Sequence, residues 1–244
     1  MKTRAFAART FKELMRDPVT VLLGAVMPAG LLLVMTIIQN NVPVVIFPLE
    51  RLAPAMAVFS LSFLSLFTGM LIARDRTSAF LMRMFATPMR AQDYILGYTL
   101  PMAPIALFSG ALSLLLAVVL GLPANVHLLT TLLTLIPSAL LFVGFGILLG
   151  TLLSDKAVGG IGSVLVQIAA IFGGAWFDLS IMKGGFRNFA YSMPFAHAVD
   201  MARAATAGDY AAILPHLWWV LGYAVIVYAA AAWLFRHRMS RGGA

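Results

Sequence analysis

The stretch APAMAVFSLSFLSLFTGMLIA, residues 53–73, contains no charged side chain. About 20 consecutive apolar residues in a helix are enough to cross the hydrocarbon core of a bilayer. Five further apolar stretches of comparable length occur at residues 19–39, 94–120, 126–153, 158–177 and 214–235, and every charged residue lies outside these cores. The sequence therefore predicts an all-α, polytopic integral membrane protein with six transmembrane helices in a single domain, residues 1–244.

The composition supports the same class. Hydrophobic residues make up 61% of the chain and charged residues only 11%, whereas a soluble domain carries about 25% charged residues. The net charge of +8 does not indicate nucleic-acid binding, because the basic residues lie in short gaps beside apolar spans. The absence of cysteine excludes disulfides, thiol chemistry and cysteine-ligated metals.

The basic residues alternate between the gaps. The two tails and the gaps at 74–93 and 154–157 hold 13 Lys and Arg, whereas the other gaps hold 4. The positive-inside rule then places both termini in the cytoplasm, and we expect the bacterial cytoplasmic membrane as the location. The gap at 154–157 is short, and fusing its two flanking spans would reverse the last part of the chain. The first apolar stretch is too long for the core of a signal peptide.

An amphipathic helix is predicted ahead of the first span, within residues 1–17. On a helical wheel Phe6, Phe11 and Leu14 fall on one half, and Lys12 falls on the other. This pattern is typical of an interfacial helix on the cytoplasmic leaflet. A simple basic topology anchor is the alternative interpretation.

Residues 178–213 form the long gap on the outer side. Pro194 is a typical first residue of a helix and Gly208 a typical stop signal, so we expect a short helix between them. This segment is predicted to lie on the outer leaflet or to dip back into it as a re-entrant unit. Asp200 and Arg203, at i and i+3, are placed to pair on this helix.

The gap RDRTSAFLMRMFATPMRAQD, residues 74–93, is too polar to cross a membrane but is regularly patterned. Phe80, Leu81 and Met84 recur at helical spacing, and Pro88 ends the pattern. A short cytoplasmic helix over residues 74–90 is therefore predicted. One interpretation is that it only sets the topology. The other is that it docks in a groove of a soluble partner and transmits motion to the spans.

This segment resembles the one that follows the second span in type-2 ABC exporter permeases. The family pattern is a charged start, a helix that ends in Thr/Ser-Pro, and a Leu-Gly that opens the third span. The matching positions here are Asp75, Arg76, Thr87, Pro88, Leu96 and Gly97. The order of features agrees over the whole chain and resembles the small six-span form without a large extracellular domain. Many members carry Glu and a Gly-Thr pair at the helix start, whereas this chain has Asp75 and Thr77-Ser78.

The resemblance implies a permease subunit that works with partners. The chain has no G-x-x-x-x-G-K-[ST] motif to hold ATP phosphates, so we expect no enzyme activity and no cofactor on this chain. ATP and magnesium would bind two separate ABC ATPase subunits. A second permease copy, as a homodimer or heterodimer, and membrane lipids complete the expected partners. The partner-docking residues are then expected to be Asp75, Arg76, Thr77, Phe80, Leu81, Met84, Thr87 and Pro88.

Catalytic and metal-binding motifs are not found in the sequence. The four histidines lie far apart, and neither H-E-x-x-H nor G-x-S-x-G occurs, so we assign no catalytic and no metal-ligating residue. The spans contain no Lys, Arg, Asp or Glu, whereas a proton- or sodium-coupled carrier normally places a charged group at membrane depth. A standalone carrier and a membrane scaffold or immunity protein remain as alternative classes.

An apolar translocation path is expected, because the spans are uncharged. The predicted path residues are Phe59, Phe63, Phe67, Met70, Gln167 and Phe172. Such a path suits export of a lipid-like or amphipathic drug or antibiotic-type substrate, although a lipid-facing surface would have the same composition. A polysaccharide or lipid-linked glycan is the alternative substrate. Trp176, Phe177 and Tyr191 near the outer end fit an interfacial aromatic belt.

Overall fold

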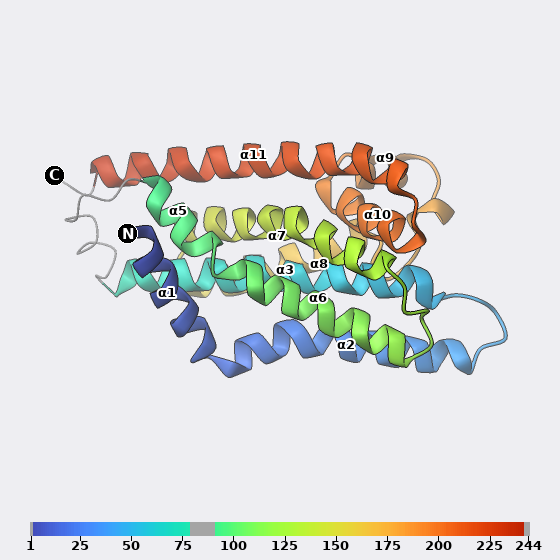
Figure 1. The fold of residues 1–244 in the computed structure, drawn as a ribbon. Coiled ribbons are helices and arrows are strands. Elements are labelled where there is room, and N and C mark those ends of the chain that lie inside the picture. The colour runs from blue at the N-terminus through green and yellow to red at the C-terminus, as the bar shows by residue number, and fades with distance from the viewer. Residues whose placement is uncertain (1, 79–90, 242–244) are drawn as a thin grey trace.

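The computed structural model describes residues 2–78 and 91–241, and every regular element in these ranges is helical (Figure 1). The elements are α1 (Lys2–Met15), α2 (Pro18–Asn40), α3 (Leu49–Thr77), α5 (Ala91–Thr99), α6 (Met102–Val119), α7 (His127–Leu152), α8 (Asp155–Phe172), the 3-10 turn η1 (Leu179–Ile181), α9 (Gly185–Tyr191), α10 (Pro194–Ala207) and α11 (Tyr210–Arg241). The start of α1 and the end of α11 lie at one end of the bundle, here named the termini end; the opposite end is named the far end (Figure 1).

Among the described residues, five helical stretches are long and apolar enough to cross a membrane. They are α3, the stretch of α5 and α6, α7, α8 and most of α11, and α2 adds a shorter apolar helix at Gly24–Asn40. The prediction of an all-helical, polytopic membrane protein is confirmed.

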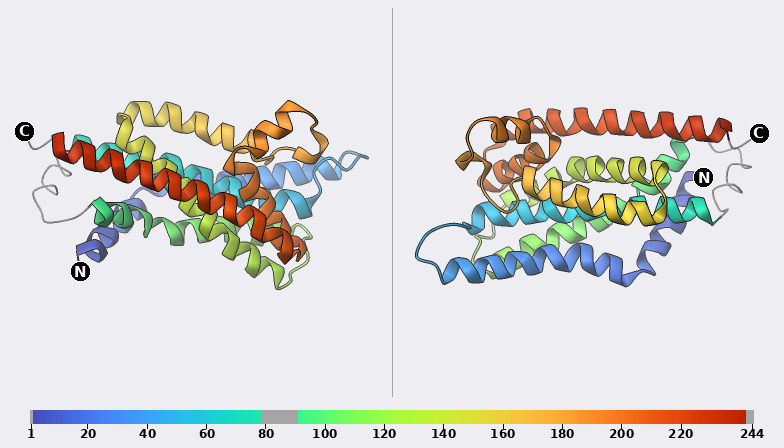
Figure 2. Two further views of the ribbon diagram at one scale, coloured as in Figure 1. Left: turned by 90° about the horizontal axis from the view of Figure 1, so that it is seen from above. Right: turned by 180° about the vertical axis from the view of Figure 1, so that it is seen from behind.

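Helix α3 is the central helix of the bundle. It packs against α2, α6, α7, α8 and α10, and most of its residues are buried (Figures 1 and 2). Three serines in its middle form hydrogen bonds within their own helix. The hydroxyls of Ser60, Ser62 and Ser65 each donate to the carbonyl oxygen three residues earlier, at 2.6 to 2.7 Å. Internal bonding of this kind satisfies polar side chains where no water is available.

Glycines allow α7 to approach α3 closely. A Cβ on Gly146 would lie 2.5 Å from the carbonyl oxygen of Ser65, and one on Gly150 would lie 2.5 Å from that of Gly69. Both distances are shorter than any normal contact, so only glycine fits at these two positions. The G-x-x-x-G spacing therefore serves packing within the chain, as small residues do between membrane helices.

Two predicted spans are interrupted or shortened. Helices α3 and α11 instead extend beyond the predicted spans 53–73 and 214–235, and α3 includes residues 74–77 of the predicted cytoplasmic helix. The stretch expected at 94–120 is divided into α5 and α6 around Pro101, which has no N–H to donate to the preceding turn. The stretch expected at 158–177 ends as a helix at Phe172. Beyond it the chain turns at Gly174, whose φ of +66° lies in the left-handed region that favours glycine.

The short helices α9 and α10 cover the far end of the bundle. Helix α10 begins at Pro194 and ends before Gly208, which has a left-handed φ of +77°, so both predicted boundaries are confirmed. Asp200 and Arg203 form the predicted pair, with 3.3 Å between Oδ1 and Nη1. Helix α10 packs against α3, α7 and α11, and it is therefore an integral layer of the fold.

Candidate functional site at the end of helix α3

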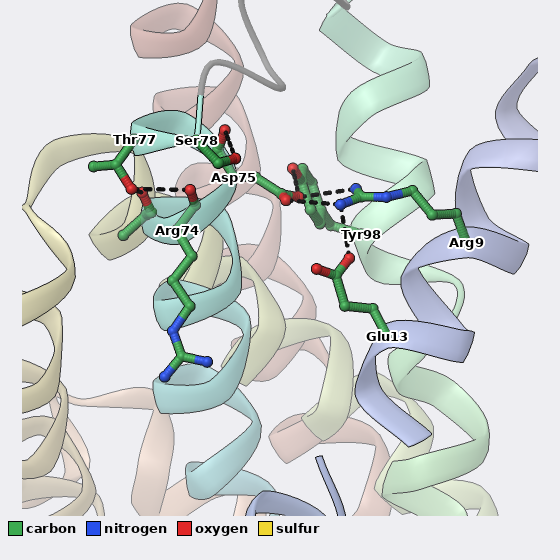
Figure 3. A network of polar contacts seen from close by, with 8 residues as sticks. Arg9, Glu13, Arg74, Asp75, Thr77, Ser78 and Tyr98 are labelled. Atoms are coloured by element: carbon green, nitrogen blue, oxygen red, sulfur yellow. Dashed lines mark hydrogen bonds and ion pairs between the residues drawn. The ribbon is translucent and has the colours of Figure 1, made fainter. Parts of the chain in front are cut away.

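A buried carboxylate marks the end of α3. The side chain of Asp75 is only 4% exposed and lies between α1 and α5 (Figure 3). Arg9 of α1 donates two hydrogen bonds to it, at 3.1 and 2.9 Å, and the phenol of Tyr98 on α5 donates a third at 2.8 Å. A buried carboxylate persists only when it is paired and hydrogen-bonded. Asp75 therefore joins three helices that are distant in sequence.

A second carboxylate shares the same guanidinium. Glu13 lies one turn after Arg9, and the distance from Arg9 Nη2 to Glu13 Oε2 is 2.8 Å. Burial raises the pKa of Glu13, and the charge of Asp75 raises it further. Burial lowers the pKa of Arg9, but its hydrogen bond to Asp75 and the neighbouring carboxylates outweigh this effect and leave that pKa raised. Arg9 thus stays charged, and α1 cannot leave without stranding the charge of Asp75.

Packing of α1 on α5 holds this arrangement in place. The ring of Phe6 meets the rings of Tyr94 and Tyr98 edge-on, with centroids 6.0 and 4.9 Å apart. Gly97 faces the same ring, and a Cβ at that position would overlap it. The glycine of the Leu-Gly at the start of the third apolar stretch therefore leaves the space that the ring of Phe6 occupies.

The apolar side of α1 is divided between two environments. Phe6 and Leu14 are buried against the protein, whereas Phe11 and Met15 remain exposed. The position of α1 on the membrane surface stays a prediction. Its contact with α5 is an additional feature that the helical wheel did not indicate.

Two arginines tie the end of α3 to α7 and α8. Arg76 donates to the carbonyl oxygens of Thr151 and Leu153, the latter at 3.0 Å. These carbonyls belong to the last turn of α7, where they have no partner within the helix. Arg74 lies 3.6 Å from Asp155 at the first turn of α8. The end of α3 is therefore connected to helices on both of its sides.

The start of α5 is also held by α1. The hydroxyl of Thr3 donates to Asp93 Oδ1 at 2.8 Å. Helix α1 thus contacts both helices that flank residues 79–90, through Arg9 at the end of α3 and through Thr3 at the start of α5. Helix α1 is therefore attached by polar contacts to both of these flanking helices.

The predicted docking residues fall into two groups. Asp75 and Arg76 point toward the helices of this chain, and the exposed Thr77 bonds to the backbone of its own helix, donating to the carbonyl oxygen of Arg74 at 2.9 Å. The other docking residues lie outside the described residues: Phe80, Leu81, Met84, Thr87 and Pro88. Docking to a partner therefore stays a prediction. The described contacts of Asp75 and Arg76 are made within this chain.

The predicted path residues are only partly brought together. Phe59, Phe63 and Phe67 stack along one side of α3, with successive ring centroids 5.5 and 6.2 Å apart, and Trp176 extends this aromatic column at 5.5 Å from Phe59. Half-buried Met70 lies beyond Phe67 on the same helix.

The remaining two path residues lie elsewhere. Phe172 belongs to a separate cluster at the far end, where its ring lies 5.4 Å from Phe186 and 5.2 Å from Phe189. Gln167 is exposed on α8. A path through all six residues stays a prediction.

The sequence interpretation missed Arg9 and Tyr98. The available signal was an acid, Asp75, at the boundary of an apolar stretch, because such a carboxylate needs a cation or hydroxyl nearby. Nothing in the sequence identified which of the five basic residues in the N-terminal segment supplies it.

Comparison with known proteins agrees with this architecture. The family model of the ABC-2 type transporter matches residues 1–206, which is most of the 244-residue chain. No curated protein matches the chain significantly. The bundle of apolar helices fits a small permease of this kind. The chain therefore belongs to the ABC-2 type transporter family, as the membrane-spanning permease component of an ABC transporter that works with ABC ATPase subunits.

Proposed function

We propose that this permease is an exporter in which residues 74–90 receive the motion of the ATPase subunits. The Arg9–Asp75–Tyr98 cluster, named here the α3 clamp, passes that motion to the bundle. The observation that carries the proposal is the double attachment of α1, to the end of α3 through Arg9 and to the start of α5 through Thr3. A push on the intervening segment acts on α1, α3 and α5 together.

The coupling needs two conformations of the permease that the ATPase distinguishes. Binding energy shifts an equilibrium only as far as the two states differ in their contacts with the ligand. The α3 clamp supplies a discrete element for such a change, because a bidentate ion pair is either made or broken. In the described state the clamp is closed.

The substrate that fits best is a lipid-like or amphipathic molecule, such as a drug or antibiotic. The aromatic column beside α3 consists of three phenylalanine rings and the indole of Trp176, and its members Phe59 and Phe63 are buried in the described state. A path along this column would open by separation of the helices around it. An exported glycan is the second candidate, and the run of aromatic rings is the feature that favours it.

The working unit is proposed to contain two permease copies and two ATPase subunits. The ATPases would bind ATP and magnesium. The unit would lie in the cytoplasmic membrane with the termini end toward the cytoplasm, since the basic residues concentrate there. The proposed direction of transport is export from the cytoplasm or the inner leaflet.

Co-expression with an ABC ATPase subunit tests the proposal. The permease is tagged and purified, and both ATP hydrolysis and export of an amphipathic dye are measured in proteoliposomes. Arg9→Gln removes the two hydrogen bonds to Asp75 and should lower export by about tenfold or more, because one partner of a buried pair is lost. An ATPase that co-purifies normally with Arg9→Gln would show that the loss lies in coupling.

Arg4→Gln is the matched control. Arg4 lies on the same helix and is exposed, so the variant makes the same change of charge without touching the clamp. Equal losses in Arg4→Gln and Arg9→Gln would contradict the role of the clamp. A glycan-export assay on the same proteoliposomes separates the two candidate substrates.

A further inference from the structure

Two cavities at the far end share a wall. The first, of about 270 Å³, is named the apolar lobe, and the second, of about 550 Å³, is named the polar lobe. The apolar lobe is lined mainly by Val45, Phe47, Leu52, Trp176, Phe177 and Ile181. The polar lobe is lined by polar groups that include Glu50, Asn125, His127, Thr206 and Asp209. Arg51 and Arg203 line both lobes.

The two arginines have different environments. Arg203 is largely buried and donates to the carbonyl oxygens of Gly174 at 2.8 Å and Arg51 at 3.3 Å, as well as to Asp200. These bonds hold the two walls of the cleft together. Arg51 forms an ion pair with Asp178, and its side chain is 54% exposed. A half-exposed ion pair contributes little to stability, so the guanidinium of Arg51 is available for a competing anion.

The apolar lobe has an exposed apolar rim. Val45 is 75% exposed on one side of it, and Ile181 is 73% exposed on the other. Its inner wall includes Trp176, whose ring contacts Phe59 and so joins the lobe to the aromatic column along α3. The inner wall would thus shield an apolar group of a ligand from water, and the same wall connects the lobe to the predicted path.

We propose that this cleft binds an anionic amphiphile. Its phosphate, sulfate or carboxylate group contacts Arg51, its apolar part fills the apolar lobe, and the rest of its polar head occupies the polar lobe. A planar guanidinium binds oxyanions through paired, charge-assisted hydrogen bonds. Pockets that bind small molecules are mostly apolar with a few placed polar groups. The cleft combines both features across one shared wall.

The assignment of this ligand as the exported substrate rests on the proposed function, whereas binding itself does not. The test therefore uses the purified permease alone, without ATPase. Because the chain contains no cysteine, Ser180→Cys places a single thiol at the exposed edge of the apolar lobe. The rate of its reaction with N-ethylmaleimide is measured in dodecyl maltoside, with octyl phosphate as the probe.

Octyl phosphate should slow the labelling by about fivefold or more and reach saturation, as expected for a charge-assisted site. Octyl glucoside and inorganic phosphate at the same concentrations should not protect the thiol. Equal protection by octyl glucoside would overturn the anionic requirement, and equal protection by inorganic phosphate would overturn the amphiphile.

Three variants in the Ser180→Cys background identify the binding group. Arg51→Gln should raise the half-protecting concentration of octyl phosphate by about tenfold. Asp178→Asn should lower it, because the competing carboxylate is removed. Arg187→Gln, which changes a basic residue at the same end that lines neither lobe, should leave it unchanged. A loss of protection in Asp178→Asn equal to that in Arg51→Gln would show a structural pair and overturn the site.

The source of the ligand is distinguished in nanodiscs. Protection that is present in phosphatidylglycerol discs before any addition, and absent in phosphatidylcholine discs, identifies an anionic bilayer lipid in the cleft. Protection only after octyl phosphate is added identifies a free amphiphile. Either result supports the site. ATP-driven export that proceeds without any protection in these assays would overturn this inference and leave the exporter proposal intact.

Discussion

The two ends of the bundle use the same kinds of charged residues in opposite ways. At the termini end, the side chain of Asp75 is 4% exposed and that of its partner Arg9 is 35% exposed, and Asp75 receives three hydrogen bonds from α1 and α5. At the far end, the side chain of Asp178 is 18% exposed and its partner Arg51 is 54% exposed beside two cavities. The difference lies in burial, and burial determines whether an ion pair holds helices together or can exchange its partner.

This contrast is the reason why we propose a different task for each end. Removing one member of a buried pair leaves an uncompensated charge, so the pair acts as a rigid connection. An exposed pair is stabilised little and is screened by salt, so a ligand can replace one member. Transmission of motion fits the termini end, and ligand binding fits the far end.

The largest expected effect comes from removing the buried carboxylate. Asp75→Ala should lower the free energy of unfolding by about 2–3 kcal/mol, because the buried phenol of Tyr98 loses its acceptor, whereas Arg9 is 35% exposed and keeps its ion pair with Glu13. Asp178→Ala should lower it by less than about 1 kcal/mol. Unfolding in detergent, followed by circular dichroism with increasing dodecyl sulfate, measures both. Equal effects of the two variants would remove the basis of the comparison.

A smaller effect is expected where α1 packs on α5. Gly97→Ala places a methyl group against the ring of Phe6, and overpacking of this kind costs about 1–3 kcal/mol. Helix α1 should loosen, and a thiol introduced by Thr10→Cys, at a fully buried position of α1, should then react faster with maleimide. Gly159→Ala is the control, because no atom lies within 4 Å of its added Cβ. Unchanged labelling in Gly97→Ala would show that α1 adapts to the methyl group.

Acidification should lower the stability of the folded protein through a pair of histidines at the far end. The side chain of His197 on α10 hydrogen-bonds to that of His216 on α11, with 2.9 Å between their Nδ1 atoms. Burial lowers the pKa of His197, and His216 lowers it further, against opposing effects of the Tyr191 carbonyl and Asp200. A folded state with a lowered histidine pKa loses stability as the pH falls below about 6.5, the ordinary histidine value.

The unfolding temperature at about pH 5.5 and about pH 7.5 tests this expectation, since these values bracket the ordinary histidine pKa. The protein should melt earlier at the lower pH, and His197→Gln should reduce the difference. Arg4→Gln, which changes an exposed basic residue at the termini end, should keep the difference. A pH dependence that is unchanged in His197→Gln would place its origin elsewhere.

The smallest expected effect concerns the second attachment of α1. Thr3→Ala removes the hydrogen bond to Asp93 and should cost about 1 kcal/mol of stability. The rate of ATP-driven export should fall by more than the small loss of stability explains. The reason is that this contact is one of the two that link α1 to the helices on either side of residues 79–90. Ser163→Ala, which removes an exposed hydroxyl bonded to its own helix at Gly159, is the control. Equal export in Thr3→Ala and wild type would leave Arg9 as the functional attachment.

The features that could be predicted from the sequence depend on neighbouring residues. The apolar stretches, the start of α10 at Pro194 and its stop at Gly208 follow from local composition and backbone preferences. The Asp200–Arg203 pair follows from helical spacing. The break between α5 and α6 at Pro101 was readable in the same way, although the stretch was expected as one span.

The features that could not be predicted join residues far apart in sequence. Arg9 and Asp75 are separated by 66 positions, and Arg76 reaches Thr151 over 75 positions. The docking residues between Phe80 and Pro88 lie outside the described residues, and their role stays a prediction. The path residues show the same limit, because helical spacing aligned Phe59, Phe63 and Phe67 but could not place Phe172 or Gln167.

The sequence by itself determined that this chain is an all-helical membrane protein, because apolar length and charge position are properties of the chain alone. Only the tertiary structure decided that α1 is locked to α3 by a buried ion pair, and that Arg51 and Arg203 face two cavities. The physical reason is burial. The helices that pack around a charged side chain determine whether it is buried and paired, or exposed to water and free to exchange its partner. That packing depends on contacts between residues far apart in the sequence, which local sequence patterns do not reveal.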